Sequence, residues 1–332
     1  MRRLTLFLLC ILLLCSCAGK KESFDGKDRP SSRGHLRVID GQLCGKDGEG
    51  VMLRGISGTG ISVSERYINN DTYHEISHFM GVNVIRLALY TYGVGTVGYC
   101  TGGDKERLYK DIQNGIQYAK DNDMYVIVDW HILEDGDPNR FMDEAVNFFE
   151  RLSAEYKDAD HLLYEICNEP NKTDWASVKS YAETVIPVIR KNDPDAVIIV
   201  GNPDWSKDLN SVLADPLEYD NLLYTLHFYS ASHKQDIRNM AENAFKQKLP
   251  VFVSEFGICA ASGGFPRDIE EADLWIDLLE EYHVSYCMWN FSMTGEACAS
   301  LRADCLKLKE YTRDDFTETG LWLMDTITSR NE

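Results

Sequence analysis

The chain has 332 residues, of which 44% are hydrophobic, and its formal net charge is −19. This length suits two ordinary domains or one large α/β barrel, and the apolar fraction is enough for a full-sized core. The acidic excess excludes nucleic acid as a partner, because neutralising phosphates requires a basic face. A neutral partner such as a polysaccharide is indifferent to this charge.

Residues 1–17 have the composition of an export signal rather than of a folded segment. Two arginines precede a predominantly apolar run over residues 4–14, which is too short to span a bilayer. Residues 14–17, Leu-Cys-Ser-Cys, resemble the lipobox of bacterial lipoproteins and predict acylation of Cys17 after cleavage. The alternative is ordinary signal-peptidase cleavage nearby. We therefore expect an exported lipoprotein of the cell envelope or outer surface, attached to the membrane through Cys17, or a secreted protein.

The rest of the chain divides into a tether and one domain. Residues 18–34 are mostly polar, which is typical of a flexible connection between a membrane and a domain. Residues 35–332 contain no linker, short-period repeat or low-complexity segment, and we expect them to form a single domain in a monomeric protein. A hairpin over residues 36–44, turned at Asp40 and Gly41, is expected under the floor of that domain.

Short apolar runs alternate with amphipathic stretches throughout the domain. The runs are apolar on both faces, as in buried parallel strands, whereas Leu108, Ile112 and Ile116 recur at helical spacing between two of them. Eight such units predict a (β/α)8 TIM barrel, an α/β fold. The alternative, a doubly wound sheet, normally carries a Gly-rich phosphate loop, which this sequence lacks. The predicted strands cover residues 51–54, 82–89, 125–129, 162–166, 196–200, 222–226, 250–254 and 284–289.

The sequence contains ten cysteines, and those at positions 10, 15 and 17 belong to the export signal. Among the others, Cys167, Cys259 and Cys287 lie in or beside apolar runs, where a thiol behaves as a small hydrophobe. Cys298 and Cys305 are candidates for one disulfide. No Cys-x-x-Cys pair or Cys/His ligand spacing appears, so we expect no metal site.

Polar and aromatic residues stand at the ends of the predicted strands. In a barrel these positions all face one rim, the C-terminal face on which active sites are built. Each residue taken alone has a structural explanation, such as an ion pair or a buried hydrogen bond. Independent structural uses would not all fall on one face, so the set favours a functional site. Its members are Arg86, His131, Asn168, Glu169, Trp205, His227, Tyr229, Glu255 and Trp289.

Two of these residues are acids on well-separated strands, which fits cleavage of a glycosidic bond. The leaving oxygen needs a proton and the anomeric carbon needs a nucleophile or an activated water, so two carboxyl groups must flank the bond. Glu169 is predicted to be the acid/base and Glu255 the nucleophile, held ionised by Arg86 and Tyr229. A separation of about 5–5.5 Å would retain the anomeric configuration, and a wider one would invert it.

Other residues of the set suit a sugar ligand. Asn168 offers an amide to a sugar hydroxyl, and Trp205 and Trp289 offer flat faces on which pyranose rings can stack. The reaction requires no metal and no cofactor. We therefore expect a polysaccharide or oligosaccharide as the substrate.

Several motifs occur in a fixed order along the domain, most of them at strand ends. They are RGIS at 54–57, NVIR at 83–86, YVIVDWH at 125–131, YEICNEP at 164–170, HFY at 227–229, VSEFG at 253–257 and Trp289. Together they resemble glycoside hydrolase family 5, subfamily 2, the endoglucanase group of secreted bacterial cellulases. The likeness covers nearly all of residues 35–332. One Asn-Glu-Pro alone would be weak support, but the ordered set is specific.

The resemblance implies a retaining (β/α)8 hydrolase that cuts within β-1,4-glucan chains. It places Glu169 as acid/base, Glu255 as nucleophile, and Asn168 on the 2-hydroxyl of the sugar at the cleavage point. Other positions match residues of the family's substrate cleft. These are Arg86, His131, His227, Tyr229, Trp289 and Glu296.

A few positions depart from the family pattern, on the side where sugars towards the non-reducing end would bind. Thr59 stands where the family usually has a histidine, and Val63 or a neighbour replaces a cleft tryptophan. A lysine expected near Thr294 is missing, although Glu296 remains. These departures leave open the same mechanism on xyloglucan, mannan or xylan. A further alternative is a surface lipoprotein that binds glycans without cleaving them.

Overall fold

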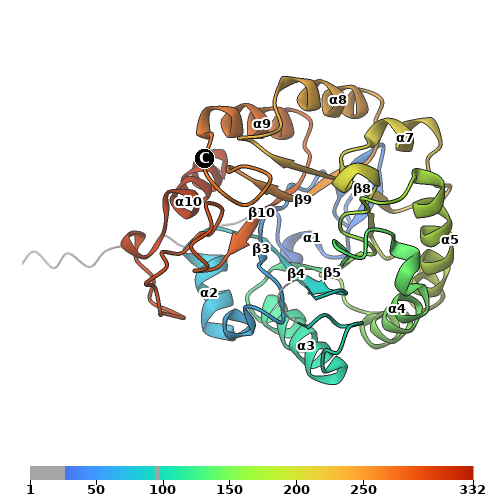
Figure 1. Cartoon of the computed structure of the whole chain (residues 1–332), viewed down its shortest axis with the longest axis horizontal. Helices are drawn as coiled ribbons and strands as arrows, with labels where there is room; N and C mark the ends of the chain where they lie inside the picture. Colours follow the sequence, from blue (N-terminus) through green and yellow to red (C-terminus); the bar gives the residue numbers. More distant parts are fainter. Residues whose placement is uncertain (1–26, 94–96, 332) are drawn as a thin grey trace, which may run out of the picture.

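The computed structural model describes residues 27–93 and 97–331. Parallel strands within them close into an eight-stranded barrel in the order β10-β3-β4-β5-β6-β7-β8-β9, and helices surround it (Figure 1). The predicted (β/α)8 architecture is therefore confirmed. The predicted export signal, with the predicted lipid anchor Cys17, lies outside the described residues. The barrel strands are β3 (Arg54–Gly58), β4 (Val84–Tyr90), β5 (Tyr125–His131), β6 (Leu162–Glu165), β7 (Ile198–Val200), β8 (Leu222–Tyr229), β9 (Val251–Gly257) and β10 (Tyr286–Phe291).

The helices pack their apolar faces on the barrel. In α3 the predicted Leu108, Ile112 and Ile116 are buried, and the side chain of Asp104 caps the helix by accepting a hydrogen bond from the amide of Arg107. In the part of the chain that the structure describes, no helix is both long and apolar enough to cross a bilayer. The helices are α1 (Pro30–Arg33), α2 (Asn70–His78), α3 (Lys105–Asp121), α4 (Met142–Tyr156), α5 (Trp175–Asn192), α6 (Pro203–Ser206), α7 (Leu209–Ala214), α8 (Gln235–Lys246), α9 (Ile269–Glu281) and α10 (Glu318–Asn331).

The first barrel strand begins later than predicted. It covers Arg54–Gly58, and the predicted run overlaps it only at one residue. Val51 and Leu53 instead pack into the apolar floor of the barrel. The strand itself contains Gly55, where a Cβ would lie 2.5 Å from Val84 Cγ1, because β4 packs closely against it. Small residues at such a close approach give no apolar, β-branched signal, which explains the misplaced boundary.

The predicted hairpin under the barrel floor is confirmed. Strand β1 (Arg37–Ile39) pairs with β2 (Gln42–Cys44) in an antiparallel ladder. Asp40 and Gly41 turn the chain between them, with φ values of 52° and 84°. Positive φ at both central residues is typical of the tight turns that join twisted strands.

Residues 27–34, which we predicted to be part of the tether, belong to the fold. Arg29 is only 6% exposed, and its guanidinium donates to Ser77 Oγ of α2 at 2.7 Å. The carboxylate of Asp28 accepts a hydrogen bond from the amide of Met52 at 3.1 Å. The composition of this segment resembles a disordered region, but its polar groups find buried partners on the barrel. The tether over residues 18–26 stays a prediction, because it lies outside the described residues.

Candidate active site

The carboxyl ends of the barrel strands bring most of the predicted rim residues together. Arg86 lies in β4, His227 in β8 and Glu255 in β9, and Glu169 follows β6; all four are buried. Strands β8 and β9 place His227 and Glu255 directly opposite each other in the ladder. These residues therefore lie on adjacent, hydrogen-bonded backbones, which fix the directions of their side chains.

Glu255 is held by two hydrogen-bond donors. Arg86 Nη1 lies 3.0 Å from Glu255 Oε2, and the hydroxyl of Tyr229 donates to Oε1 at 2.7 Å. Burial, together with the charge of Glu255, raises the pKa of Tyr229 well above its ordinary value, so the hydroxyl keeps its proton. A cation and a neutral donor thus stabilise and orient an ionised carboxylate, which is what a nucleophile requires.

Arg86 lies at the centre of a buried ionic network. Besides Glu255, its guanidinium contacts Glu165 at 2.7 Å and Asp129 at 2.9 Å. Burial opposes the charge of Arg86, but the surrounding carboxylates raise its pKa well above the ordinary value. Nη2 also donates to Asn168 Oδ1 at 2.6 Å, which fixes the orientation of the Asn168 amide. The arginine therefore stays charged and positions the side chains around it.

Glu169 has a histidine as its partner rather than an arginine. Its Oε1 lies 2.8 Å from Nδ1 of His227. Burial raises the pKa of Glu169 to about 7. Burial also lowers the pKa of His227 to about 4. A neutral carboxylic acid beside a neutral imidazole is therefore the favoured state below neutral pH.

Ser254 determines where the proton of this pair lies. Its hydroxyl donates to Glu165 Oε1 at 2.6 Å, so its oxygen accepts the N–H of His227 Nε2 at 3.0 Å. A neutral imidazole with its hydrogen on Nε2 has a bare Nδ1. The 2.8 Å contact then requires Glu169 to donate its own proton to His227. The network keeps Glu169 protonated, which is the state that a general acid needs.

Glu169 and Glu255 face each other across the mouth of the barrel. One oxygen of each, together with a ring nitrogen of His227, lie within 4.8 Å of one another. Retaining glycosidases typically hold their two carboxyl groups about 5–5.5 Å apart. Among the described residues these donors are the one cluster close enough to hold a metal ion. However, Glu255 already contacts the Arg86 guanidinium and His227 binds Glu169, so the arrangement suits proton transfer and nucleophilic attack better than metal binding.

Aromatic rings line one side of the site. His131 Nδ1 contacts Asp129 Oδ2 at 2.6 Å, and the His131 ring stacks on Trp289 with centroids 5.5 Å apart and planes 14° apart. Tyr90 packs on His131 with ring centroids 4.2 Å apart. Burial lowers the pKa of His131 to about 4, so the ring is neutral at neutral pH. Trp289, predicted as a stacking surface for a pyranose ring, is 8% exposed within this wall.

Two predicted site residues lie outside this cluster. Trp205 follows β7 and is 46% exposed, and the ammonium of Lys207 lies 5.0 Å from the centre of its ring. Glu296 is exposed on the loop after β10, where its Oε2 accepts a hydrogen bond from Asn290 Nδ2 at 3.3 Å. Neither residue contacts the two glutamates through a hydrogen bond or ion pair in the described part of the chain.

Sequence reasoning gave no site role to Glu165, Ser254 or Tyr90. Glu165 is fully buried at the end of β6. A charged residue inside an otherwise apolar strand is the signal that could have found it, because such a residue needs a buried partner. Ser254 and Tyr90 carry no comparable signal, since hydroxyl and aromatic residues are common in strands.

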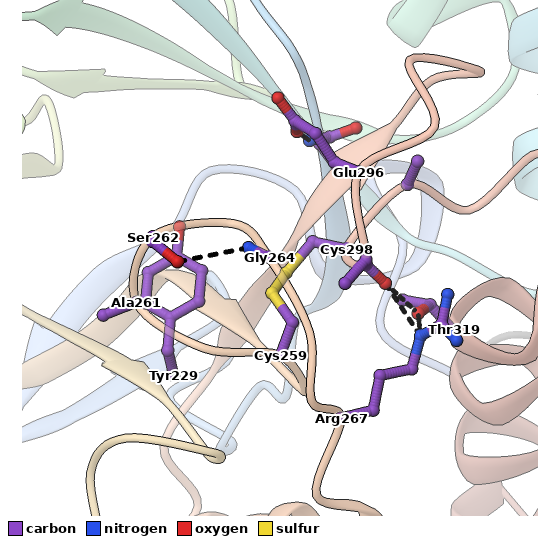
Figure 2. The surroundings of a disulfide bond; sticks show 12 residues. Tyr229, Cys259, Ala261, Ser262, Gly264, Arg267, Glu296, Cys298 and Thr319 are labelled. Carbon is purple, nitrogen blue, oxygen red and sulfur yellow. Dashed lines mark hydrogen bonds between the residues drawn. A yellow bond between two sulfur atoms is a disulfide. The ribbon is translucent and has the colours of Figure 1, made fainter.

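The structure contains a disulfide between Cys259 and Cys298, whose Cα atoms are 5.7 Å apart (Figure 2). The interpretation of Cys259 as a small hydrophobic thiol is therefore wrong. The candidate pair of Cys298 and Cys305 does not form, and Cys305 is a buried free thiol. Cys259 follows β9 and Cys298 follows the neighbouring β10. Adjacency of strands in the barrel, rather than closeness in sequence, determines which cysteines meet. Cys167 and Cys287 are buried free thiols, as predicted.

A closed barrel with two carboxyl groups facing each other at its mouth is the arrangement that retaining glycoside hydrolases use. The sequence matches the cellulase family, glycosyl hydrolase family 5, over residues 44–295. The chain belongs to this family.

Individual relatives agree with this assignment. The chain is 45% identical to endoglucanase A of Butyrivibrio fibrisolvens over 89% of its own length and 68% of the relative's. It is 36% identical to an endoglucanase of Clostridium saccharobutylicum, over 90% of this chain and 66% of that protein. It thus spans about two thirds of these curated relatives. The solved catalytic domain of a Thermobifida fusca endoglucanase, in complex with cellotetraose, superimposes with a TM-score of 0.86 at 34% identity, covering 90% of this chain and 99% of that one.

Proposed function

We propose that the protein is a retaining endo-β-1,4-glucanase, a cellulase that hydrolyses internal bonds of a β-glucan. The observation that carries the proposal is the opposition of Glu169 and Glu255 within 4.8 Å, each with a different kind of partner. The substrate class is supported by relatives named endoglucanases and by the cellotetraose bound to the Thermobifida fusca domain.

In the first step, Glu255 attacks the anomeric carbon while Glu169 gives its proton to the glycosidic oxygen. The new bond to Glu255 forms as the bond to the leaving sugar breaks, and that sugar departs with a free hydroxyl. In the second step, Glu169, now a carboxylate, takes a proton from water. The water oxygen attacks the anomeric carbon and Glu255 is released. One water is consumed, and two inversions leave the configuration retained.

The glutamine variants of the two acids test these roles. On a soluble β-glucan, Glu169→Gln and Glu255→Gln should each lower kcat by at least about 10³-fold, because each removes a group that the reaction requires. A dinitrophenyl cellobioside separates them, since its leaving group needs no proton. On it Glu169→Gln should still release a burst of dinitrophenol, and Glu255→Gln should release none.

Glu281→Gln provides the matched control, because it makes the same exchange at an exposed position at the end of α9. This variant should cleave the glucan at the wild-type rate. Full activity in either of the two site variants would defeat the proposal.

A second candidate keeps the mechanism but changes the polymer to xyloglucan, mannan or xylan. Thr59 is 8% exposed and its hydroxyl donates to Asn290 Oδ1 at 3.3 Å, so it is engaged within the protein. Val63 is 52% exposed and offers no aromatic face to a sugar. A panel of polymers decides between the candidates. Turnover of mannan with none on any β-glucan favours the second candidate, whereas binding without any product favours a non-catalytic glycan-binding lipoprotein.

We also infer that the protein is a monomer, exported and anchored to the cell envelope by a lipid on Cys17. The support is the apolar run over residues 4–14 and the Leu-Cys-Ser-Cys sequence that follows it. Expression in a bacterium fed a palmitate analogue should label the wild type and leave Cys17→Ser unlabelled. Cys15→Ser is the matched control and should keep the label. Label on Cys17→Ser would contradict the anchor.

A further inference from the structure

The disulfide between Cys259 and Cys298 lies behind the residues that hold Glu255. Both cysteines are completely buried. They belong to a small apolar cluster that includes Trp289, and Tyr229 packs against this cluster. Figure 2 draws the disulfide with Tyr229 and Glu296 in its surroundings. The crosslink is thus part of the wall of the site rather than of a distant surface loop.

Gly257 allows the disulfide and Tyr229 to approach each other. A Cβ at this position would lie 2.7 Å from Cys298 Sγ and also 2.7 Å from Cδ1 of Tyr229. The sulfur and the tyrosine ring therefore both border the bare Cα of Gly257, and Tyr229 packs against the apolar cluster that contains both cysteines. The hydroxyl of the same ring donates to Glu255 Oε1 at 2.7 Å. A continuous line of contacts runs from the disulfide through Tyr229 to Glu255.

The disulfide also joins the loop after β9 to the loop after β10. The amide of Ala297 donates to the carbonyl of Gly263 at 3.0 Å, and Arg267 Nε donates to the carbonyl of Ala297 at 2.9 Å. The amide of Asn290, in β10, donates to the carbonyl of Cys298 at 3.2 Å. These bonds hold the segment that carries Cys298 against β10 and against the loop after β9.

We propose that the Cys259–Cys298 disulfide is a positioning element for catalysis. It presses the ring of Tyr229 into place and thereby fixes the hydrogen bond that orients Glu255. The inference rests on the proposed function, because it treats Glu255 as the nucleophile. A crosslink that only stabilised the fold could join the two loops without touching Tyr229.

The test measures how fast a dinitrophenyl 2-fluoro-cellobioside inactivates each variant. This reagent traps the glycosyl-enzyme, and its leaving group needs no acid, so the rate reports attack by Glu255 alone. Cys259→Ala/Cys298→Ala should be inactivated about tenfold more slowly than wild type, under conditions where circular dichroism shows it folded. That factor corresponds to about 1.4 kcal/mol of transition-state stabilisation. Cys44→Ala, which removes a buried free thiol on the barrel floor, is the control and should match wild type.

A conservative variant and a combination with Tyr229→Phe separate positioning from stability. Cys259→Ala/Cys298→Val places an apolar side chain beside Tyr229 without a covalent link. It should be inactivated at least about threefold faster than the double alanine variant, because packing against Tyr229 returns. In the Tyr229→Phe variant, removing the disulfide as well should lower the inactivation rate by less than about twofold relative to Tyr229→Phe alone. A full tenfold loss in that background, no recovery with valine, or a wild-type rate in the double alanine variant would overturn the inference.

The outcome for the wild type distinguishes this inference from the proposed function. Mass spectrometry should find the fluoro-sugar on the peptide that contains Glu255. If the wild type carries no label there, the proposed nucleophile is wrong and the proposed function fails. If the label is present and the variants react as fast as wild type, only the role of the disulfide fails.

Discussion

Glu169 and Glu255 are the same type of side chain within one site, but their neighbours favour a neutral Glu169 and an ionised Glu255. Glu255 accepts hydrogen bonds from a guanidinium and a tyrosine hydroxyl, whereas Glu169 faces a neutral histidine. Burial raises the pKa of Glu169 to about 7, and the contact with His227 is compatible with that protonated form. The division of labour between acid and nucleophile therefore depends on the side chains that bind the two carboxyl groups.

This arrangement predicts that activity declines as the pH rises through about 7, because Glu169 then loses the proton that the leaving group needs. Ser254→Ala should move this alkaline limb of kcat/KM to lower pH by at least about half a unit. Without the serine oxygen, His227 can carry its hydrogen on Nδ1 and donate it to Glu169, which favours the carboxylate.

Ser153→Ala serves as the control for this prediction, because Ser153 is a buried serine on α4, away from the barrel mouth. Its pH profile should coincide with that of the wild type. An alkaline limb that stays in place in Ser254→Ala would contradict the assigned position of the proton.

At the scale of elements, the order of strands and the buried faces of helices follow from the sequence. The ends of the strands are predicted less accurately. Strands β8 and β9 run on to Tyr229 and Gly257, beyond the predicted ends at residues 226 and 254. Polar residues at these positions resemble the end of a strand. In a barrel, however, such side chains can point into the mouth while the backbone continues its hydrogen bonds to the neighbouring strand. In β3 it was small residues that concealed most of the strand, as Gly55 illustrates.

Gly55 provides the test at this scale. A Cβ there would lie 2.5 Å from both Cys287 Sγ and Val84 Cγ1, so Gly55→Ala should lower the free energy of unfolding by about 1–3 kcal/mol through overpacking. Urea denaturation measures this change. Gly50→Ala is the control, because nothing lies within 4 Å of a Cβ at that position. Equal stability of the two variants would contradict the close packing of the first strand.

For the whole molecule, the sequence predicts which residues gather at the rim but not how they bond. Parallel strands bring their carboxyl ends to one face, so Arg86, Glu169 and Glu255 could be placed together without a structure. The bonds among Ser254, His227 and their neighbours depend on side chains that face each other across the barrel, and no local pattern records these. The same holds for the disulfide, which joins neighbouring strands.

The disulfide also predicts a contribution to global stability. It links residues that are 39 positions apart, and crosslinks that close loops of this size typically stabilise a protein by about 2–4 kcal/mol. Cys259→Ala/Cys298→Ala should lose that amount in the free energy of unfolding, measured by urea denaturation. Cys44→Ala removes no crosslink and should lose less. An unchanged stability in the double variant would mean that the bond constrains neither the folded nor the unfolded chain.

The most direct test of the central claim is the configuration of the first product formed from a cello-oligosaccharide, observed by proton NMR before mutarotation. Glu169 and Glu255, with carboxyl oxygens within 4.8 Å of each other, leave room for attack by Glu255 but not for a water between them. We therefore expect the β-anomer to appear first. Initial release of the α-anomer would contradict this expectation, because that product arises only from direct attack by water.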